Sequence, residues 1–166
     1  ISLLFLSCSS STETGEIIVD PDPVILSNPN ILLIIADDMG KDATPNYPEG
    51  TIKPTMPTLQ SLISTGITFD NLWSYSVCTP TRASIITGKY GVKSGVLEVG
   101  DQISTAETSS QEYIDANTGN EYATAIVGKW HLSNNISDPQ TMGIDYYAGL
   151  LNGGVQSYTN WNLVEN

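Results

Sequence analysis

The chain has 166 residues, which is enough for one ordinary domain with a buried core. Its formal net charge is −12, with 18 acidic residues against six lysines and arginines. This excess of negative charge argues against binding to nucleic acid or to an anionic membrane surface, because both require clustered Lys and Arg side chains. An acidic protein that binds an anion needs a local group of cationic side chains or a metal ion.

The N-terminus predicts an exported protein. Residues 1–8 are mostly apolar and far too short to span a bilayer, which is typical of the end of a secretory signal segment. Leu6-Ser7-Cys8 resembles a bacterial lipoprotein processing site with Cys8 as the acylated residue, although Phe5 departs from the usual small aliphatic side chain. The alternative is an ordinary signal peptide. We expect a bacterial cell-envelope lipoprotein, periplasmic or at the cell surface, that contacts the membrane only through its lipid anchor.

The remaining residues predict a polar tether followed by alternating strands and helices. Residues 9–28 are rich in Ser, Thr, Pro, Asp and Glu, which predicts a disordered tether. The aliphatic run 31–35 predicts a strand that is buried on both faces. A helix is predicted at 55–66, with Thr55 as N-cap, Pro57 in the first turn and a left-handed Gly66. Further expected elements are a short strand at 67–73, a helix at about 80–87 closed by Gly88, and a buried strand at 122–127.

This order of elements predicts an α/β fold in which a mixed, mainly parallel sheet is sandwiched between helices.

Two short motifs contain most of the candidate chemistry. Residues 78–82 have Cys-x-Pro-x-Arg spacing at the start of a predicted helix, and residues 128–131, Gly-Lys-Trp-His, follow a predicted strand. Arg82 is the chain's one arginine and His131 its one histidine, so their presence in these motifs indicates a site for an anion. The alternative is a buried cysteine beside a solvent-facing helical arginine. A Cys8–Cys78 disulfide is not expected, because it would consume the candidate nucleophile.

The motifs resemble those of the formylglycine-dependent sulfatases. The segment 78–88 resembles the signature of that family, and residues 29–40, 125–132 and 143–147 resemble further family segments in the same order. The resemblance covers roughly residues 29–166 and implies the N-terminal part of a catalytic domain with an alkaline-phosphatase-like fold. Because family domains are longer, we expect the chain to be catalytically incomplete, with further metal ligands and the general acid beyond Asn166.

The resemblance also implies a role for each candidate residue. Cys78 would be converted to formylglycine by a formylglycine-generating enzyme, and the hydrated aldehyde has two hydroxyls. One would ligate the metal and attack sulfur, and the other would then expel sulfate. Arg82 would hold the formylglycine, Lys129 would contact sulfate oxygens, and His131 would hydrogen-bond a formylglycine hydroxyl. Lys129 and His131 could point to the same side if extended geometry persists beyond the strand, whereas Trp130 is expected to pack in the core.

Asp37 and Asp38 are the candidate metal ligands. They follow the predicted strand 31–35, at the sheet edge where ligands bind in open α/β folds. Paired carboxylates suit a hard divalent cation, and the alternative is that one of them caps the following segment. With the resemblance, we expect Asp37, Asp38 and the modified Cys78 to bind Ca²⁺, with Mg²⁺ as the second choice. An unmodified thiolate would be a poor ligand for such a cation.

The predicted function is hydrolysis of sulfate esters, with a sulfated glycan as the substrate class suggested by a surface-anchored enzyme. One alternative is a phosphonate monoester or phosphodiester hydrolase that uses the same formylglycine. A second alternative is a non-catalytic lipoprotein that binds a metal or a glycan. A cysteine-dependent phosphatase loop is excluded by spacing, because it needs Cys-x5-Arg.

Overall fold

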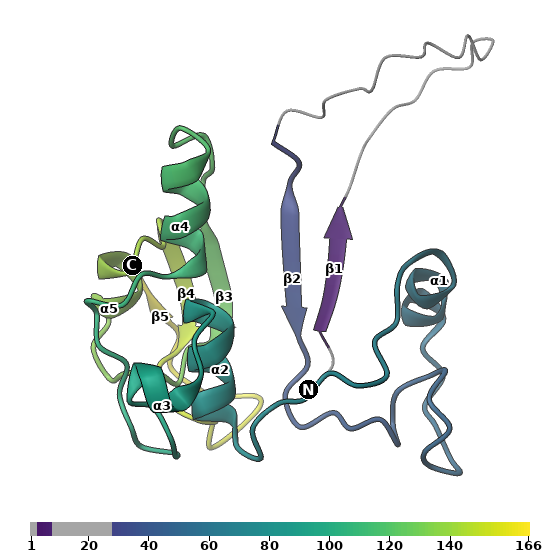
Figure 1. Cartoon of the computed structure of the whole chain (residues 1–166). Coiled ribbons are helices and arrows are strands. Elements are labelled where there is room, and N and C mark those ends of the chain that lie inside the picture. Colours follow the sequence, from purple (N-terminus) through teal and green to yellow (C-terminus); the bar gives the residue numbers. More distant parts are fainter. Residues whose placement is uncertain (1–2, 8–27) are drawn as a thin grey trace, which may run out of the picture. The chain divides into compact units, whose positions relative to one another are not determined.

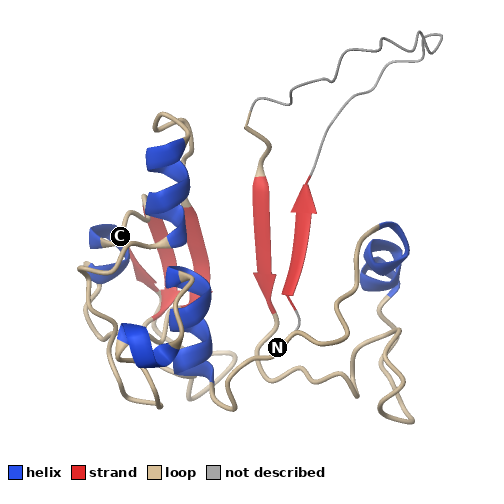
Figure 2. Cartoon of the chain, in the orientation of Figure 1, coloured by secondary structure: helices blue, strands red, loops and turns tan. Residues whose placement is uncertain are grey.

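The computed structural model describes residues 3–7 and 28–166, which divide into two compact units, Ile1–Trp73 and Ser74–Asn166. Figures 1 and 2 show the helices and strands of each unit. None of the helices in the described ranges is long and apolar enough to cross a membrane. In chain order the elements are β1 (Leu3–Ser7), β2 (Ile31–Ile35), α1 (Pro57–Thr65), α2 (Cys78–Thr87), α3 (Gly91–Ser94), α4 (Ser110–Asn117), β3 (Ala125–Lys129), α5 (Asp138–Thr141), β4 (Tyr146–Leu150) and β5 (Val164–Glu165).

The first unit contains a two-stranded antiparallel ribbon, in which β1 pairs with β2 and Leu3 lies opposite Ile35. The strand predicted at 31–35 is confirmed, but its predicted burial on both faces is wrong. Ile31 and Leu32 are 53% and 57% exposed, because among the described residues of this unit no helix packs on the ribbon. The predicted signal segment 1–8 overlaps β1, and its role as a signal stays a prediction. Cys8 and residues 9–27 of the predicted tether lie outside the described residues.

Helix α1 is shorter at both ends than predicted. The N-cap is Met56 rather than Thr55, because a residue that precedes proline is disfavoured in helical geometry and Pro57 begins the helix. Gly66 at the C-cap is extended, with φ −107°, so the expected left-handed conformation is wrong. Its amide nevertheless donates to the carbonyl oxygen of Leu62 at 2.9 Å, which closes the last turn.

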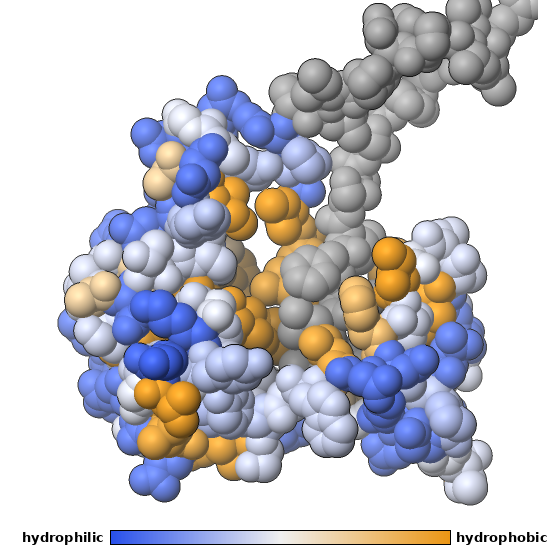
Figure 3. All heavy atoms as spheres, in the orientation of Figure 1, coloured by the Kyte–Doolittle hydropathy of each residue, from blue (hydrophilic) through white to orange (hydrophobic). Residues whose placement is uncertain are grey.

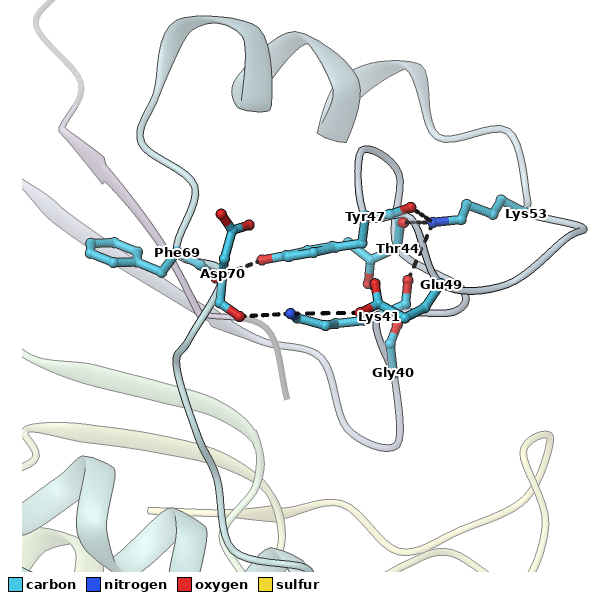
Figure 4. Close-up of polar contacts among 8 residues, drawn as sticks. All are labelled: Gly40, Lys41, Thr44, Tyr47, Glu49, Lys53, Phe69 and Asp70. Carbon is cyan, nitrogen blue, oxygen red and sulfur yellow. Dashed lines mark hydrogen bonds and ion pairs between the residues drawn. The ribbon is translucent and has the colours of Figure 1, made fainter.

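The strand predicted at 67–73 does not form. Its carbonyl groups accept hydrogen bonds from side chains instead of from a neighbouring strand (Figure 4). Lys41 Nζ donates to the carbonyl oxygen of Asp70 at 2.6 Å, and the Tyr47 hydroxyl donates to that of Phe69 at 3.0 Å. The residues therefore form a loop that is fastened to the segment 40–53.

Segment 40–53 is organised around Lys53. The Lys53 ammonium donates to the carbonyl oxygens of Thr44 at 2.7 Å, Tyr47, and Lys41 at 3.4 Å, and Figure 4 shows these bonds converging on one nitrogen. The Lys41 ammonium lies over the Tyr47 ring, 4.7 Å from its centroid. These contacts hold in place the loop that follows Asp37 and Asp38.

The second unit contains a mixed three-stranded sheet with the order β3-β4-β5. Strands β3 and β4 are parallel, and β5 is antiparallel to β4. The predicted α/β class with a mixed sheet is confirmed. Strand β3 begins at Ala125 rather than Tyr122, because the Thr124 amide donates to the Asp145 carboxylate at 2.7 Å instead of entering the ladder.

The core of the second unit brings together residues from α2, from the segment 96–103 and from the chain between Trp130 and Tyr147. Trp130 and Tyr147 pack edge to face, with ring centroids 6.3 Å apart, and the Trp130 indole donates to the Ser133 hydroxyl at 3.1 Å. Trp130 is therefore a packing residue, as predicted. Figure 3 shows that hydrophobic atoms also remain at the surface of both units. The buried apolar residues are Ala83, Ile86, Val96, Ile103, Trp130, Leu132, Met142, Ile144 and Tyr147.

Candidate functional site

Cys78 is the first residue of helix α2, two residues earlier than the predicted helix start. The preceding Val77 is extended and no side chain caps the helix, so the first turn presents backbone N–H groups that lack helical partners. Gly88 ends the helix in the left-handed conformation, with φ 66°, as predicted. The local sequence thus places residue 78 where the helix dipole favours an anion.

His131 lies beside Cys78, although 53 residues separate them in the chain. Cys78 Sγ is 3.2 Å from His131 Nδ1, and the Thr79 hydroxyl oxygen is 3.4 Å from the same nitrogen. Cys78 is a free cysteine in the structure. The two motifs singled out in the sequence therefore meet at one point.

The end of β3 directs His131 toward this point. Beyond the strand, the Trp130 amide donates to the carbonyl oxygen of Leu150 at 2.9 Å, and the His131 amide donates to that of Leu151 at 3.0 Å. His131 itself is left-handed, with φ 56°, a conformation in which histidine is enriched relative to most residues. Extended geometry therefore ends before His131, so the condition under which strand alternation would place Lys129 and His131 on the same side is not met.

Arg82 provides a second contact between the Cys-x-Pro-x-Arg motif and the Gly-Lys-Trp-His motif. Its side chain is buried, and Nη1 donates to the carbonyl oxygen of Lys129 at 2.6 Å. The alternative of a solvent-facing helical arginine is therefore wrong. Lys129 is half-buried at the last position of β3. Arg82 and His131 thus both link the start of α2 to the end of β3, where Lys129 is the last strand residue.

Tyr147 places an uncharged hydroxyl group near Arg82 and the end of β3. Its hydroxyl donates to the carbonyl oxygen of Gly128 at 3.3 Å. Burial raises the pKa of Tyr147 from 10.0 to about 12, and the positive charge of Arg82 partly offsets that rise. Tyr147 therefore remains protonated across the physiological range.

Asp37 and Asp38 belong to the first unit, whereas Cys78, Arg82, Lys129 and His131 belong to the second. Both aspartates are exposed at a turn after β2, and Asp38 is left-handed, with φ 56°. The next described helix, α1, begins only at Pro57, so neither aspartate is a helix N-cap. Within the described ranges, no three His, Cys, Asp or Glu side chains form a group that could hold a metal ion.

The structure adds two residues that sequence reasoning missed. Thr79 contacts His131 Nδ1 from a variable position of the first motif. Gly153 lies against the His131 ring, because an ideal Cβ at Gly153 would be 2.7 Å from Cε1 and 2.8 Å from Nε2. A glycine in a loop 22 residues beyond His131 carries no local signal of such a contact.

The family-like segment 143–147 has a structural role. The Asp145 carboxylate accepts from the amide and hydroxyl of Thr124, at 2.7 and 3.1 Å, which joins the starts of β3 and β4. Farther along, the strands approach closely at two glycines. An ideal Cβ on Gly149 would be 1.7 Å from the carbonyl oxygen of Gly128, and Gly128 has φ 117°. The close approach of Gly128 and Gly149 therefore fixes the position of β3 just before the residues that lead to His131.

Comparison with known proteins identifies relatives over most of the chain. The chain is 38% identical to mouse (Mus musculus) arylsulfatase G over 135 residues, 74% of this chain and 24% of that protein. It is 31% identical to human steryl-sulfatase over 140 residues, 75% of this chain and 24% of that protein. The chain thus spans about a quarter of the length of these curated relatives.

A crystal structure of Ps i-CgsB in complex with k-i-k-neocarrahexaose is 28% identical to this chain, with a TM-score of 0.43 over 48% of this chain and 18% of that one. The model of the family described as Sulfatase matches residues 29–166, the range over which the motifs resemble that family. The chain therefore belongs to the sulfatase family, whose alkaline-phosphatase-like α/β fold agrees with its mixed sheet.

Proposed function

We propose that the full-length protein containing this chain hydrolyses sulfate esters and that Cys78 is converted to formylglycine. The observation that carries the proposal is the 3.2 Å contact between Cys78 Sγ and His131 Nδ1, which joins the two family motifs in one site. Membership of the sulfatase family supports the reaction class. Because the chain spans about a quarter of its curated relatives, the activity is assigned to the longer protein.

The formylglycine hydrate would supply one hydroxyl as the nucleophile and a second hydroxyl for expulsion of sulfate. The chain's own residues prepare the site for this group. The first turn of α2 directs backbone N–H groups toward residue 78, where they stabilise negative charge. His131 Nδ1 is within hydrogen-bonding distance of the atom that the modification replaces, so the imidazole can hold or move a proton there.

Arg82 and Lys129 supply positive charge of two kinds. Arg82 is buried and bonded to the backbone of Lys129, so its guanidinium is fixed in place and maintains a constant positive field near residue 78. The Lys129 ammonium is carried on a flexible stem, which suits contact with sulfate oxygens as a point charge. A site that binds an anionic sulfate ester in a protein of charge −12 requires such a local concentration of cations.

Asp37 and Asp38 are proposed to hold a divalent metal ion, Ca²⁺ or, as the alternative, Mg²⁺. Their carboxylates are exposed and provide only oxygen donors, which fits a hard cation. The Cys78 thiol does not fit such an ion, whereas the oxygens of a formylglycine hydrate do. The metal would supply Lewis-acid stabilisation of charge on the sulfate group.

Export as a bacterial lipoprotein remains part of the proposal, supported by the Leu6-Ser7-Cys8 pattern. An enzyme anchored at the cell envelope meets extracellular polymers, so a sulfated glycan is the proposed substrate class. Maturation requires a formylglycine-generating enzyme as a transient partner.

The test is to produce the full-length protein with a formylglycine-generating enzyme and to compare kcat/KM on matched aryl sulfate, phosphate diester and phosphonate monoester substrates. We expect an aldehyde at residue 78 by peptide mass spectrometry and the highest kcat/KM on the sulfate ester, since only differential transition-state stabilisation raises turnover. A higher kcat/KM on the phosphate diester or the phosphonate monoester would show that phosphorus esters, and not sulfate esters, are the substrate class. Activity with an unmodified thiol would exclude the nucleophile, and no turnover on any substrate would favour a binding protein.

A further inference from the structure

We infer that Gly153 is a positioning residue, which keeps the His131 imidazole against Cys78 because it has no side chain. An ideal Cβ at Gly153 would lie 2.7 Å from His131 Cε1, 2.8 Å from Nε2 and 3.3 Å from Nδ1. The first two distances are shorter than real Cβ contacts allow. The functional part of this inference rests on the proposed role of His131 in sulfate-ester hydrolysis.

Gly153 is needed for space rather than for backbone conformation. Its φ is outside the left-handed region that favours glycine, in contrast to Gly128 and Gly143, whose φ angles are 117° and 77°. Alanine could therefore adopt the backbone of Gly153 without strain, and the nearest atoms that its methyl group would meet belong to the imidazole.

The neighbouring Gly154 provides a matched control within the same loop. It also lies outside the left-handed region, and an ideal Cβ there would have no atom within 4 Å. Two adjacent glycines thus differ mainly in what a methyl group would contact. Alanine at either position restricts the unfolded chain to a similar extent, so a comparison of the two variants isolates the contact with His131.

The imidazole cannot move away from a methyl group without disturbing its contacts with α2. Nδ1 faces Cys78 Sγ at 3.2 Å and the Thr79 hydroxyl at 3.4 Å. The loop is also constrained, because the carbonyl oxygen of Leu151, two residues before Gly153, accepts from the His131 amide at 3.0 Å. A side chain at 153 would therefore turn the ring away from residue 78 or break the bond that holds the loop.

The direct test is the NMR spectrum of the imidazole in the full-length protein. The ring signals of His131 are assigned by their absence from the spectrum of His131→Ala. We expect the ring ¹H, ¹³C and ¹⁵N shifts to move in Gly153→Ala and to keep their wild-type positions in Gly154→Ala. Unmoved signals in Gly153→Ala, or equal movement in both variants, would overturn the inference.

A double-mutant cycle covers the case in which Gly153→Ala folds poorly. In a His131→Ala background the methyl group has no ring to meet, so Gly153→Ala should lower Tm in the wild type and leave it equal or slightly higher in His131→Ala. Contacting residues are expected to show such non-additivity. An equal loss of Tm in both backgrounds would show that the methyl group meets something else and would overturn the inference.

Turnover of the full-length, formylglycine-containing protein tests the functional part separately. Gly153→Ala should lower kcat on an aryl sulfate by roughly 10- to 100-fold with little change in KM, since misplacement of a reacting group by about 1 Å can cost about 10²-fold. Gly154→Ala should keep the wild-type kcat. Moved ring signals with an unchanged kcat would overturn the functional part and the proposed role of His131, while the contact itself would stand.

Discussion

The guanidinium of Arg82 donates a hydrogen bond to the backbone carbonyl oxygen of Lys129, with 2.6 Å between Nη1 and the oxygen. The arginine of one motif therefore bonds the main chain of the other and fixes the start of α2 against the end of β3. Lys129 precedes His131 by two residues, so this bond also restrains the segment from which the imidazole reaches Cys78.

Replacing Arg82 by methionine should destabilise the chain. The variant removes a hydrogen bond from a charged donor and leaves the Lys129 carbonyl group without it, which costs about 1–3 kcal/mol. The measurement is the free energy of unfolding by urea. Lys89→Met is the control, because Lys89 pairs with Glu107 at the surface and such a pair contributes about 0–1 kcal/mol. If both substitutions lower the free energy of unfolding equally, the buried Arg82 hydrogen bond contributes no more to stability than the surface ion pair of Lys89.

Asp37→Asn and Asp38→Asn should weaken Ca²⁺ binding far more than they lower stability. Asparagine is tolerated in the left-handed region, so Asp38→Asn keeps the backbone at φ 56° and removes only the charge. Isothermal titration of the full-length protein with Ca²⁺ measures the affinity. Asp70→Asn, which removes another exposed charge from the same unit, should leave it unchanged. If all three variants bind Ca²⁺ like the wild type, the aspartates are not ligands.

The stability of the second unit should fall as the pH rises above 10. The pKa of Tyr147 is about 12 in the folded chain against 10.0 ordinarily, so folding favours the protonated phenol. Its contribution is complete below pH 10 and is lost as the pH rises toward 12. For a shift of about two units this amounts to roughly 1–3 kcal/mol.

Tyr147→Phe isolates this effect from the titration of other groups. Phenylalanine has no ionisable hydroxyl, so the unfolding free energy of the variant should fall less steeply than that of the wild type between pH 10 and 12. Loss of the bond to Gly128 lowers its stability by about 0.5–1.5 kcal/mol below pH 10, where the wild-type phenol is protonated and donates this bond. Parallel curves for the two proteins would contradict the prediction.

Lys53→Met should loosen the loop that follows Asp37 and Asp38. The variant removes donor bonds to three carbonyl groups, and hydrogen bonds from a charged donor contribute about 1.5–3 kcal/mol each at most. Hydrogen exchange of the Ala43 and Thr44 amides, which bond within this loop, should become faster. Lys93→Met, at an exposed position of α3, should leave these amides unchanged. Unchanged exchange in Lys53→Met would mean that the loop holds its shape without the ammonium.

Cys8→Ser should abolish lipid attachment if residues 6–8 are a lipoprotein processing site. The serine hydroxyl cannot accept the thioether-linked lipid, so incorporation of labelled palmitate should disappear and the protein should leave the membrane fraction. Cys78→Ser is the control and should retain the label. A Cys8→Ser protein that is still labelled would exclude the lipoprotein assignment.

Local signals predicted α2 and, with a later start, β3 of the second unit, whereas α3, α4, α5, β4 and β5 were not predicted. Cys78 and Gly88 bound α2 because backbone preferences at a helix start and at a left-handed C-cap act over a few residues. The same kind of signal failed at 67–73, where strand-like alternation lost to hydrogen bonds from Lys41 and Tyr47, more than 20 residues away. Long-range partners decide such segments, and residue alternation does not reveal them.

The sequence alone determined which candidate site residues this protein contains. Cys-x-Pro-x-Arg and Gly-Lys-Trp-His supply a candidate nucleophile, an arginine, a lysine and an imidazole. Only the tertiary structure decided that Nδ1 of His131 faces Cys78 and that Gly153 lies behind the ring. The Gly153 contact depends on the pairing of β3 with β4, which continues to His131 and Leu151, whereas the Cys78 contact comes from α2. Both partners are distant from His131 in the chain, by 22 and 53 positions, and therefore leave no trace in local sequence.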